Sequence, residues 1–366
     1  MRILHVLNHT QRLNGHVHAA VDLACAQVAQ GHDVCVASGG GDFDGLLNLK
    51  GVHTVLVDHK RSFPNLAKAL VRLRSHVRSF RADVVHAHMM TSAVLAFPVC
   101  RISGIPLITT VHNEFEKSAT LMGLGTRVIA VSDVVGASMQ RRGVPSSRLS
   151  VVLNGTIGSA RSDGRSEEPA PLASPSILFV GGLHPRKGLP DLMQALEIVH
   201  RSNPNVHLYI VGDGPHRDAY KDMASQLACA KAIAFVGPTT DPYPYMLGAD
   251  IFVLPSHADP APLVLSEARE ARCAVIGTQV DGIPQLLEHG DAGILVPPHD
   301  PSALAEALIQ MVETPGKIDE WKARSQLRID HLTIDRVARE TMQVYISALA
   351  SRSTADAGKV KHSNLA

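Results

Sequence analysis

The chain alternates short apolar runs, rich in β-branched residues, with longer stretches of helical periodicity. In the first half the apolar runs are RILHVL (2–7), DVCVAS (33–38), TVLVD (54–58), DVVHAH (83–88), PLITTVH (106–112), VIAVS (128–132) and SVVLN (150–154). Helical stretches such as AAVDLACAQVAQ (19–30) and TSAVLAFPVCRISG (91–104) lie between them. This alternation predicts a parallel β-sheet covered by helices on both faces.

The periodicity stops at residues 158–176, GSARSDGRSEEPAPLASPS, whose proline, serine, glycine and charge content predicts a linker. The same alternation then restarts with SILFV (176–180), VHLYIVG (206–212), AIAFVG (232–237), IFVLPS (251–256), CAVIGT (273–278) and GILVPP (293–298). We therefore predict two doubly wound α/β domains, at 1–157 and 177–332, joined by the linker at 158–176. A last helix at 333–350 is expected to pack back on the first domain, and 351–366 is predicted to be a disordered tail.

Composition narrows the class of protein. The 366 residues include 35 basic and 34 acidic side chains, so no global charge favours nucleic acid as a partner. The five cysteines show no metal-ligand spacing and are expected to be buried thiols in a reducing compartment. The first residues lack the features of a signal peptide, and no apolar stretch reaches the ~18 residues of a spanning helix, so we expect a cytoplasmic protein.

Ligands of doubly wound sheets bind at the carboxyl ends of the strands, so the following loops are the place to look for chemistry. Lys187 lies in the glycine-rich turn VGGLHPRKG after SILFV, just before a helix predicted to begin near 189 or 190. A lysine beside a helix N-terminus favours an anion, although a plain surface lysine would give the same pattern. After IFVLPS, Asp259 in a loop and Glu267 in the next helix could accept hydroxyl hydrogen bonds, whereas Glu270 is expected to be a solvated charge.

The loops of the first half give weaker signals. His112 ends the run PLITTVH and could hydrogen-bond a substrate or transfer a proton, although the chain has 20 histidines. His86 and His88 alternate along one strand and are expected to have structural roles, and no metal site is predicted. Gly15, before a helix, would let backbone N–H groups approach a phosphate.

Residues 60–81, KRSFPNLAKALVRLRSHVRSFR, contain seven lysines or arginines and no acid. Leu66, Leu70, Leu73, Val77 and Phe80 follow helical spacing along one face. The segment predicts a basic amphipathic helix that contacts an anionic membrane surface through basic residues including Lys68, Arg72, Arg74, Arg78 and Arg81. An ordinary packed helix with a solvated basic face is the alternative.

Several of these segments together resemble glycosyltransferase family 4, the retaining GT-B enzymes that use nucleotide-sugar donors. The segments that carry the resemblance are VGGLHPRKG (180–188), VGDGP (211–215), FVG (235–237), ADIFVLPS (249–256), DPAPLVLSE (259–267), DGIPQLL (281–287) and GILVPPHDPSALAEAL (293–308), with NGHVHAA, DVVHAH and TTVHN in the first half. The resemblance spans nearly the whole chain and implies two Rossmann-like domains facing each other across a cleft.

The resemblance also implies roles for individual residues. Lys187 would bind the donor diphosphate and stabilise the leaving group, and Glu267 would hold the ribose hydroxyls. Asp259 would contact the donor sugar, and His112 would contact both the donor sugar and the phosphate. The remaining residues implied at the donor site are Gly15, Gly182, Arg186, Gly237, Pro262 and Leu263. Members of this type usually need no metal, and no cofactor is expected beyond the donor substrate.

The sequence departs from the family pattern at three positions. The family commonly has arginine where Gly182 stands, and Arg186, four residues further along, is the candidate substitute. Asp259 replaces the usual glutamate, which shortens the side chain by one methylene, and Gln285 stands where glutamate is common. These changes bear on the donor-phosphate geometry and on the identity of the donor.

The sequence is compatible with three functions. The first is retaining transfer of a hexose-type sugar to a glycan or polyprenyl-linked acceptor, in bacterial envelope or exopolysaccharide synthesis, by an enzyme that is cytoplasmic and peripheral on the inner membrane. The second is epimerisation of a nucleotide sugar by the same architecture, and the third is a degenerate partner subunit without turnover. Donor base, sugar, linkage and oligomeric state are left open by the sequence.

Overall fold

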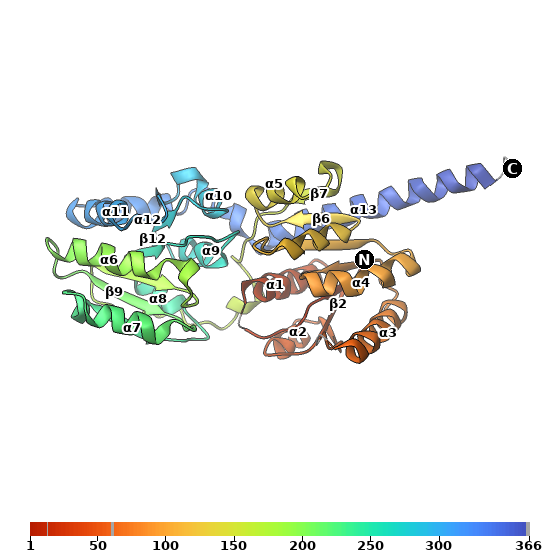
Figure 1. The fold of residues 1–366 in the computed structure, drawn as a ribbon, viewed down its shortest axis with the longest axis horizontal. Helices are drawn as coiled ribbons and strands as arrows, with labels where there is room; N and C mark the ends of the chain where they lie inside the picture. Colours follow the sequence, from red (N-terminus) through yellow and green to blue (C-terminus); the bar gives the residue numbers. More distant parts are fainter. Residues whose placement is uncertain (13, 60–61, 364–366) are drawn as a thin grey trace. The chain divides into compact units, whose positions relative to one another are not determined.

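The chain folds into two compact α/β units, as the alternation of its sequence predicts. The computed structural model describes residues 1–12, 14–59 and 62–363, with the backbone alone for residue 63 and for residues 352–363. Unit 1 consists of Met1–Asp163 and the residues from Thr333 onward, and unit 2 consists of Gly164–Leu332. Figure 1 labels the elements along the chain.

Unit 1 is built on a seven-stranded sheet in which every strand pair is parallel. The strands are β1 (Arg2–Val6), β2 (Asp33–Ser38), β3 (His53–Leu56), β4 (Val84–Ala87), β5 (Leu107–Val111), β6 (Arg127–Ala130) and β7 (Leu149–Val151), in the order β3-β2-β1-β4-β5-β6-β7. The helices are α1 (Gly15–Ala29), α2 (Asp44–Leu49), α3 (Phe63–Ser79), α4 (Met90–Ser103), α5 (Asp133–Arg141) and α13 (Ile334–Ser363), with 3-10 turns η1 (Lys117–Leu124), η2 (Ser146–Arg148) and η3 (Ala160–Ser162).

Unit 2 repeats the plan with a six-stranded parallel sheet. Its strands are β8 (Ser176–Val180), β9 (His207–Val211), β10 (Ile233–Gly237), β11 (Ile251–Leu254), β12 (Ala274–Thr278) and β13 (Ile294–Val296), in the order β10-β9-β8-β11-β12-β13. The helices are α6 (Leu189–His200), α7 (Arg217–Ser225), α8 (Tyr243–Gly248), α9 (Leu263–Glu270), α10 (Ile283–Leu286), α11 (Pro301–Glu313) and α12 (Lys317–Arg324), with η4 (Pro185–Lys187), η5 (Ala230–Ala232), η6 (Glu288–Gly290) and η7 (Ile329–Leu332).

Both sheets reverse their strand order at one point. In unit 1 the chain runs outward from β1 to β3 and then crosses back to place β4 on the other side of β1; in unit 2 the same reversal separates β8 from β11. Loops after two such strands turn away from each other and leave a crevice at the carboxyl edge of the sheet, where ligands of open α/β sheets bind. The topology therefore singles out the loops after β1 and β4, and those after β8 and β11.

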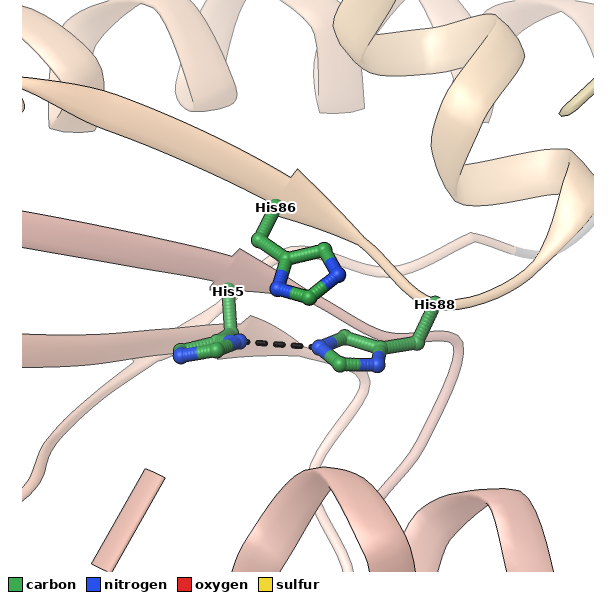
Figure 2. Close-up of side chains that lie close together, drawn as sticks. All are labelled: His5, His86 and His88. Carbon is green, nitrogen blue, oxygen red and sulfur yellow. Dashed lines mark hydrogen bonds between the residues drawn. The ribbon is translucent and has the colours of Figure 1, made fainter. Parts of the chain in front are cut away.

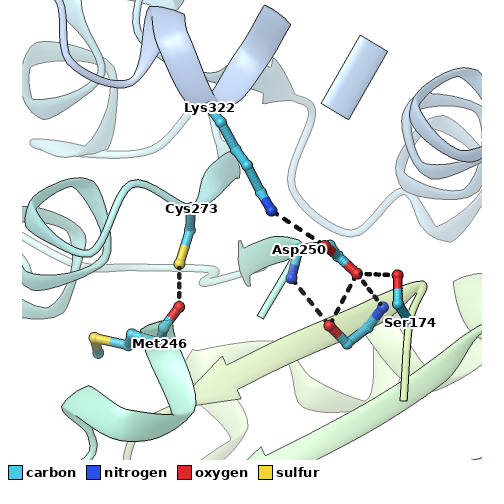
Figure 3. Close-up of polar contacts among 6 residues, drawn as sticks. Ser174, Met246, Asp250, Cys273 and Lys322 are labelled. Carbon is cyan, nitrogen blue, oxygen red and sulfur yellow. Dashed lines mark hydrogen bonds and ion pairs between the residues drawn. The ribbon is translucent and has the colours of Figure 1, made fainter. Parts of the chain in front are cut away.

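The opposite, amino edge of the unit 2 sheet is closed by a polar cluster around Asp250 (Figure 3). The Asp250 carboxylate accepts hydrogen bonds from Ser174 Oγ at 2.7 Å, the Ser176 backbone N–H at 3.0 Å and Lys322 Nζ at 3.1 Å. Burial alone would raise the pKa of Asp250, but these hydrogen bonds and the lysine charge outweigh it and lower the pKa. The cluster joins the start of β8, the start of β11 and α12. These hydrogen bonds hold the two strands that flank the switch point of unit 2 in fixed positions at their amino ends.

Two boundaries differ from the sequence-based expectation. The units meet between Asp163 and Gly164, inside the stretch predicted as a linker, and both halves of that stretch are tied down. Arg161 pairs with the buried Asp22 at 2.8 Å, and Arg165 pairs with Glu270 at 2.8 Å. The last helix continues to residue 363, although a disordered tail was predicted from 351, because no proline interrupts its backbone hydrogen bonds there. Residues 364–366 lie outside the described part of the chain.

Helix α13 belongs to unit 1, where Met342, Val344, Tyr345 and Ala348 join the buried core of the sheet.

The basic helix α3 is also packed against its own unit: Ala69, Leu73 and Val77 are buried, so most of the apolar face is already covered. Lys68, Arg72, Arg74, Arg78 and Arg81 are exposed, and Lys60 and Arg61 lie outside the described residues. In the described chain no helix is both long and apolar enough to cross a membrane.

Candidate functional site

The turn between β8 and α6 is shaped by Gly188. This residue has φ +65°, and a Cβ added to it would lie 1.9 Å from the carbonyl oxygen of Pro255, so only glycine allows the turn to press against the loop after β11. The His257 backbone N–H donates to the Arg186 carbonyl at 2.8 Å across the same contact. Helix α6 begins at Leu189, as predicted, with Pro190 in its first turn.

This contact brings Lys187 and Asp259 together. Lys187 Nζ lies 2.5 Å from Asp259 Oδ2, and their side chains are 12% and 9% exposed. The Asp259 backbone N–H donates to the Asp281 carboxylate at 2.7 Å, which ties the loop after β11 to the loop after β12. Burial raises the pKa of Asp281, and the nearby Asp259 charge adds to the rise, while this hydrogen bond opposes it.

The other residues of unit 2 that the resemblance implies at the donor site lie on the neighbouring loop and helix segments and at the end of β10. Arg186 is exposed, and its Nη1 donates to the Ala258 carbonyl at 3.4 Å. Glu267 is partly buried on α9, eight residues after Asp259. Pro262 caps α9 and has no N–H, whereas Leu263 opens the helix, so the first turn of α9 still offers backbone N–H groups. Gly237 ends β10 with φ +94°.

Gly182 has little free space beside it. A Cβ at this position would lie 3.1 Å from the ring of His184, which stands two residues further along the same loop. Arginine at this position would therefore require His184 to move. The His184 ring is exposed, so it can shift, but it occupies the space beside the position where the family commonly has arginine.

Sequence reasoning missed a second cluster in the loops of unit 2. His257 Nε2 lies 2.7 Å from Asp191 Oδ2, and the His257 and His299 rings are 3.6 Å apart between centroids. Ligand atoms of these three residues lie close enough together to hold a metal ion. They come from the first turn of α6, the loop after β11 and the loop after β13, so no local spacing in the sequence indicated them.

In unit 1, Gly15 and His112 lie at neighbouring loops of the carboxyl edge. Gly15 opens α1, whose N-cap Asn14 makes no side-chain capping bond, and Leu13 before it lies outside the described residues. His112 follows β5, and its ring centroid is 6.0 Å from that of His16 on α1. The N-terminus of α1 therefore faces the region of His112.

An open cavity of 190 Å³ lies at the same edge. Its polar lining comprises Asn8, His88, Thr91, Thr110, His112, Asn113, Glu116 and Ser118. These residues follow β1, β4 and β5, so the cavity lies at the switch point of the sheet. Among the described residues that line it there is one carboxylate and no lysine or arginine. Such a lining suits uncharged, hydroxyl-bearing groups better than phosphate.

His5 on β1, His86 on β4 and His88 just after β4 form a cluster (Figure 2); all three are buried, and His88 also lines the cavity. His5 and His86 are register partners, and His5 Nδ1 lies 2.8 Å from His88 Nε2. Ligand atoms of the three residues lie close enough to hold a metal ion. Each of the six ring nitrogens, however, already has a protein hydrogen-bond partner. The cluster is therefore explained as a hydrogen-bond network, in line with the structural roles predicted for His86 and His88.

Two family models match the chain, one in each half. "Glycosyltransferase Family 4" matches residues 13–157, and "Glycosyl transferases group 1" matches residues 174–314. The glycogen synthase of Mycobacterium tuberculosis is 30% identical over 295 residues, which cover 74% of this chain and 70% of that protein. A phosphatidyl-myo-inositol mannosyltransferase of Mycolicibacterium smegmatis is 28% identical over 277 residues, covering 72% and 70%.

Solved structures agree with the fold. The Anabaena protein Alr3699/HepE in complex with UDP superposes with a TM-score of 0.79 at 20% identity, covering 95% of this chain and all of that chain. The lipopolysaccharide outer core galactosyltransferase WaaB gives 0.74 at 17% identity, covering 95% and 99%. At these identities the likeness concerns the fold alone, and it confirms the GT-B class predicted from the sequence.

Proposed function

Because this chain belongs to glycosyltransferase family 4, we propose that it moves a hexose-type sugar, with retention, from a nucleotide-diphosphate sugar to a hydroxyl of a glycan or lipid-linked acceptor. The observation that carries the proposal is the contact between Lys187 and Asp259 at the switch point of unit 2. A largely buried cation and a carboxylate that can accept hydroxyl hydrogen bonds lie side by side there, beside the N-terminus of α6. The two ends of a sugar diphosphate need these two kinds of group.

Unit 2 is the proposed donor domain. Lys187 and the N-terminus of α6 stabilise the departing diphosphate as its charge develops, while Asp259 binds hydroxyls of the transferred sugar. Glu267 accepts hydrogen bonds from the ribose. The Anabaena neighbour was solved with UDP and with UDP-glucose, so uridine nucleotides are the first donors to test; guanosine nucleotides come next.

The proposed reaction needs neither a protein nucleophile nor a metal. The sugar–phosphate bond breaks with oxocarbenium character, and the acceptor hydroxyl attacks the same face of the sugar. Its proton passes to an oxygen of the leaving phosphate, so the phosphate acts as the base. Positive side chains and helix N-termini supply the charge stabilisation that a divalent cation gives in other transferases.

Unit 1 is the proposed acceptor domain. The described residues that line its cavity offer amides, hydroxyls, imidazoles and one carboxylate, with no lysine or arginine, which matches a polyol or glycan end group. The names of two relatives cite glycogen and phosphatidyl-myo-inositol, and each of these molecules is rich in hydroxyls. A lipid-linked acceptor would bring its sugar to this cavity, while its anionic headgroups lie near basic side chains elsewhere on the unit.

Helix α3 supplies such side chains. Since Leu73 and Val77 are buried, the helix would meet an anionic surface through its exposed lysines and arginines, without inserting its buried face. Val71 is 69% exposed among them and would add a small apolar contact. This form of contact is peripheral and depends on salt. It fits synthesis of an envelope or exopolysaccharide glycan at a membrane.

A thermal-shift screen against UDP, GDP and their sugar conjugates tests the proposal, because a ligand of the native state raises the melting temperature. We expect one nucleotide series to shift the protein, and the shift to fall in Lys187→Ala and Glu267→Ala. Turnover without acceptor to an epimeric nucleotide sugar would favour an epimerase. Binding of the donor without its consumption, whichever acceptor is added, would favour a degenerate subunit. Gly182, which stands where the family commonly has arginine, would then be the first residue to examine as the cause.

A further inference from the structure

Seven side chains of unit 1 form one continuous line of hydrogen bonds that begins at His112. His112 Nε2 lies 3.2 Å from His88 Nδ1, His88 Nε2 lies 2.8 Å from His5 Nδ1, and His5 Nε2 lies 2.8 Å from Gln27 Oε1. The line continues from Gln27 Nε2 to Tyr345 Oη at 3.3 Å, from Tyr345 Oη to His86 Nδ1 at 2.6 Å, and from His86 Nε2 to Thr110 Oγ1 at 2.7 Å. It connects β1, β4 and β5 to α1 and α13.

A neutral imidazole has one donor nitrogen and one acceptor nitrogen, so neighbouring histidines in such a line cannot choose their tautomers independently. His112, His88 and His5 are linked ring to ring, so if one of them carries its proton on Nε2, the other two must do so. If one of them carries it on Nδ1, all three must, and the Gln27 amide must be turned over. His86 joins the line through the Tyr345 hydroxyl, which can accept from Gln27 and donate to His86 Nδ1. The three linked rings therefore have two joint states, and one residue that favours a direction decides between them.

Gln27 is that residue, because its amide has a third neighbour. Met342 Sδ lies 3.8 Å from Gln27 Nε2. A thioether sulfur accepts hydrogen bonds weakly and donates none, so the amide –NH₂ belongs on the side of Met342 and Tyr345. The carbonyl oxygen then faces His5, which must donate from Nε2. His88 and His112 follow with their own protons on Nε2.

Burial supports this neutral, ordered state. The pKa of His5 falls to about 4 and that of His112 to about 3, because burial disfavours their charged forms. Burial also lowers the pKa of His86 and His88 well below the usual value. A second proton on any of these rings would set two N–H groups against each other in the line, which adds to the same preference.

We propose that Gln27, oriented by Met342, holds His112 in the Nε2–H tautomer, so that His112 Nδ1 is left as an acceptor for a substrate hydroxyl. The role of His112 Nδ1 as an acceptor rests on the proposed function, because it assumes that a sugar reaches His112. It also narrows the role implied by the family resemblance. A neutral His112 whose only proton points at His88 can bind a sugar hydroxyl, but it has no hydrogen to offer a phosphate oxygen. Gln27, Met342 and Tyr345 are positioning residues in this scheme.

The tautomers can be read directly, without substrate, from long-range ¹H–¹⁵N spectra of the full chain labelled with ¹⁵N-histidine. Substitutions of single histidines assign the signals. We expect His5, His86, His88 and His112 to carry their protons on Nε2 in the wild type. In Gln27→Leu the acceptor for His5 is gone, and His112 is expected to populate both tautomers. A wild type with Nδ1–H in His112, or an unchanged spectrum in Gln27→Leu, overturns the proposal.

A milder pair of variants keeps the test usable if Gln27→Leu folds poorly. Met342→Leu removes the sulfur and little volume, and it is expected to shift part of the His112 population to Nδ1–H. Met139→Leu makes the same exchange at a fully buried methionine of α5 and serves as the control, with an unchanged spectrum. If the spectrum of Met342→Leu is also unchanged, the sulfur does not set the direction.

Turnover tests separately whether His112 Nδ1 accepts a substrate hydroxyl. Where the tautomer is mixed, kcat/KM should fall by roughly tenfold, by analogy with the lower end of the range for removing the orienting partner of a metal-bound histidine. Unchanged kcat/KM in a variant whose His112 tautomer is mixed would remove His112 from substrate binding and leave the hydrogen-bond line standing. Turnover by the wild type, together with retained turnover in His112→Ala, separates this outcome from failure of the enzyme assignment as a whole, in which the wild type itself would not turn over.

Discussion

Lys187 Nζ lies 2.5 Å from Asp259 Oδ2, although the two residues are 72 positions apart in the sequence. They meet because β8 and β11 are neighbours in the sheet and their loops end on the same edge. Each residue serves as the counter-ion of the other in a largely buried position. In the proposed mechanism a diphosphate that binds Lys187 must compete with Asp259, whose carboxylate then becomes available to a sugar hydroxyl. The proposal therefore couples donor binding to the placement of the Asp259 carboxylate.

Replacing Lys187 by alanine should lower turnover by roughly 100-fold or more, in line with the loss of a single charge-stabilising donor elsewhere. Steady-state rates with the preferred donor measure this effect. Lys231→Ala, which removes an exposed lysine of the same unit, is the control. Because the variant leaves Asp259 buried without its partner, its melting temperature must be measured too. Wild-type turnover in a folded Lys187→Ala protein would exclude the leaving-group role.

Asp259→Asn should separate binding from catalysis. Without the competing carboxylate, Lys187 is free for phosphate, so free nucleoside diphosphate should bind more tightly than to the wild type. Turnover should fall, because the sugar loses its carboxylate partner. Calorimetry with the diphosphate product and rates with the intact donor give the two values. Weaker binding of the diphosphate would show that Asp259 supports Lys187 instead of competing with it.

The sequence determined the architecture well, because each parallel strand is a continuous apolar run bounded by turn residues. Each of the thirteen predicted runs overlaps a strand. It also placed Lys187 and Asp259 correctly in loops after strands. It could not show that these residues touch, since contact depends on strand order. Nor could it single out the hydrogen-bond partners Gln27 and Tyr345, which come from two helices 318 positions apart and carry no motif of their own.

The buried histidines should make stability fall steeply in mild acid. Between the ordinary histidine value of 6.5 and about 4, the unfolded chain binds a proton at His5 and the folded protein does not. Proton uptake then favours unfolding, so the free energy of unfolding decreases as the pH falls through this window. His86, His88 and His112 have pKa values lowered in the same direction and add to the slope.

Urea unfolding at several pH values in this window gives the number of protons taken up, which should be more than one. His5→Asn should make the slope shallower. His53→Asn, at an exposed histidine of β3, should leave it unchanged. A flat free energy of unfolding across the window would mean that the histidines are protonated in the folded protein.

Neutralising the basic face of α3 should weaken membrane binding. Lys68, Arg72, Arg74, Arg78 and Arg81 are exposed, and each charge near an anionic surface contributes about 1 kcal/mol. Changing Arg72, Arg74 and Arg78 to glutamine should therefore reduce binding to anionic liposomes by on the order of 100-fold at low salt. Flotation measures the bound fraction.

The matched control for this helix changes Arg201, Arg217 and Lys231 of unit 2 to glutamine, which removes the same net charge elsewhere. This variant should float like the wild type. Equal flotation of the α3 variant and the wild type would leave α3 as an ordinary packed helix. If both triple variants lose the same fraction of liposome binding, the net charge of the protein, and not the α3 surface, would account for the binding.

Chelation should leave the transferase active, because the proposed mechanism stabilises the diphosphate with Lys187 and helix N-termini. The prediction has a specific competitor in unit 2, where Asp191, His257 and His299 could hold a divalent ion. Dialysis against EDTA should not change turnover, and neither should His299→Ala. His289→Ala is a close control, since His289 is also exposed and has φ +56° beside φ +58° for His299. Loss of turnover on chelation, restored by added metal in the wild type and in His289→Ala but not in His299→Ala, would place a required ion at this cluster. The diphosphate would then be neutralised by that ion, with Lys187 in a supporting role.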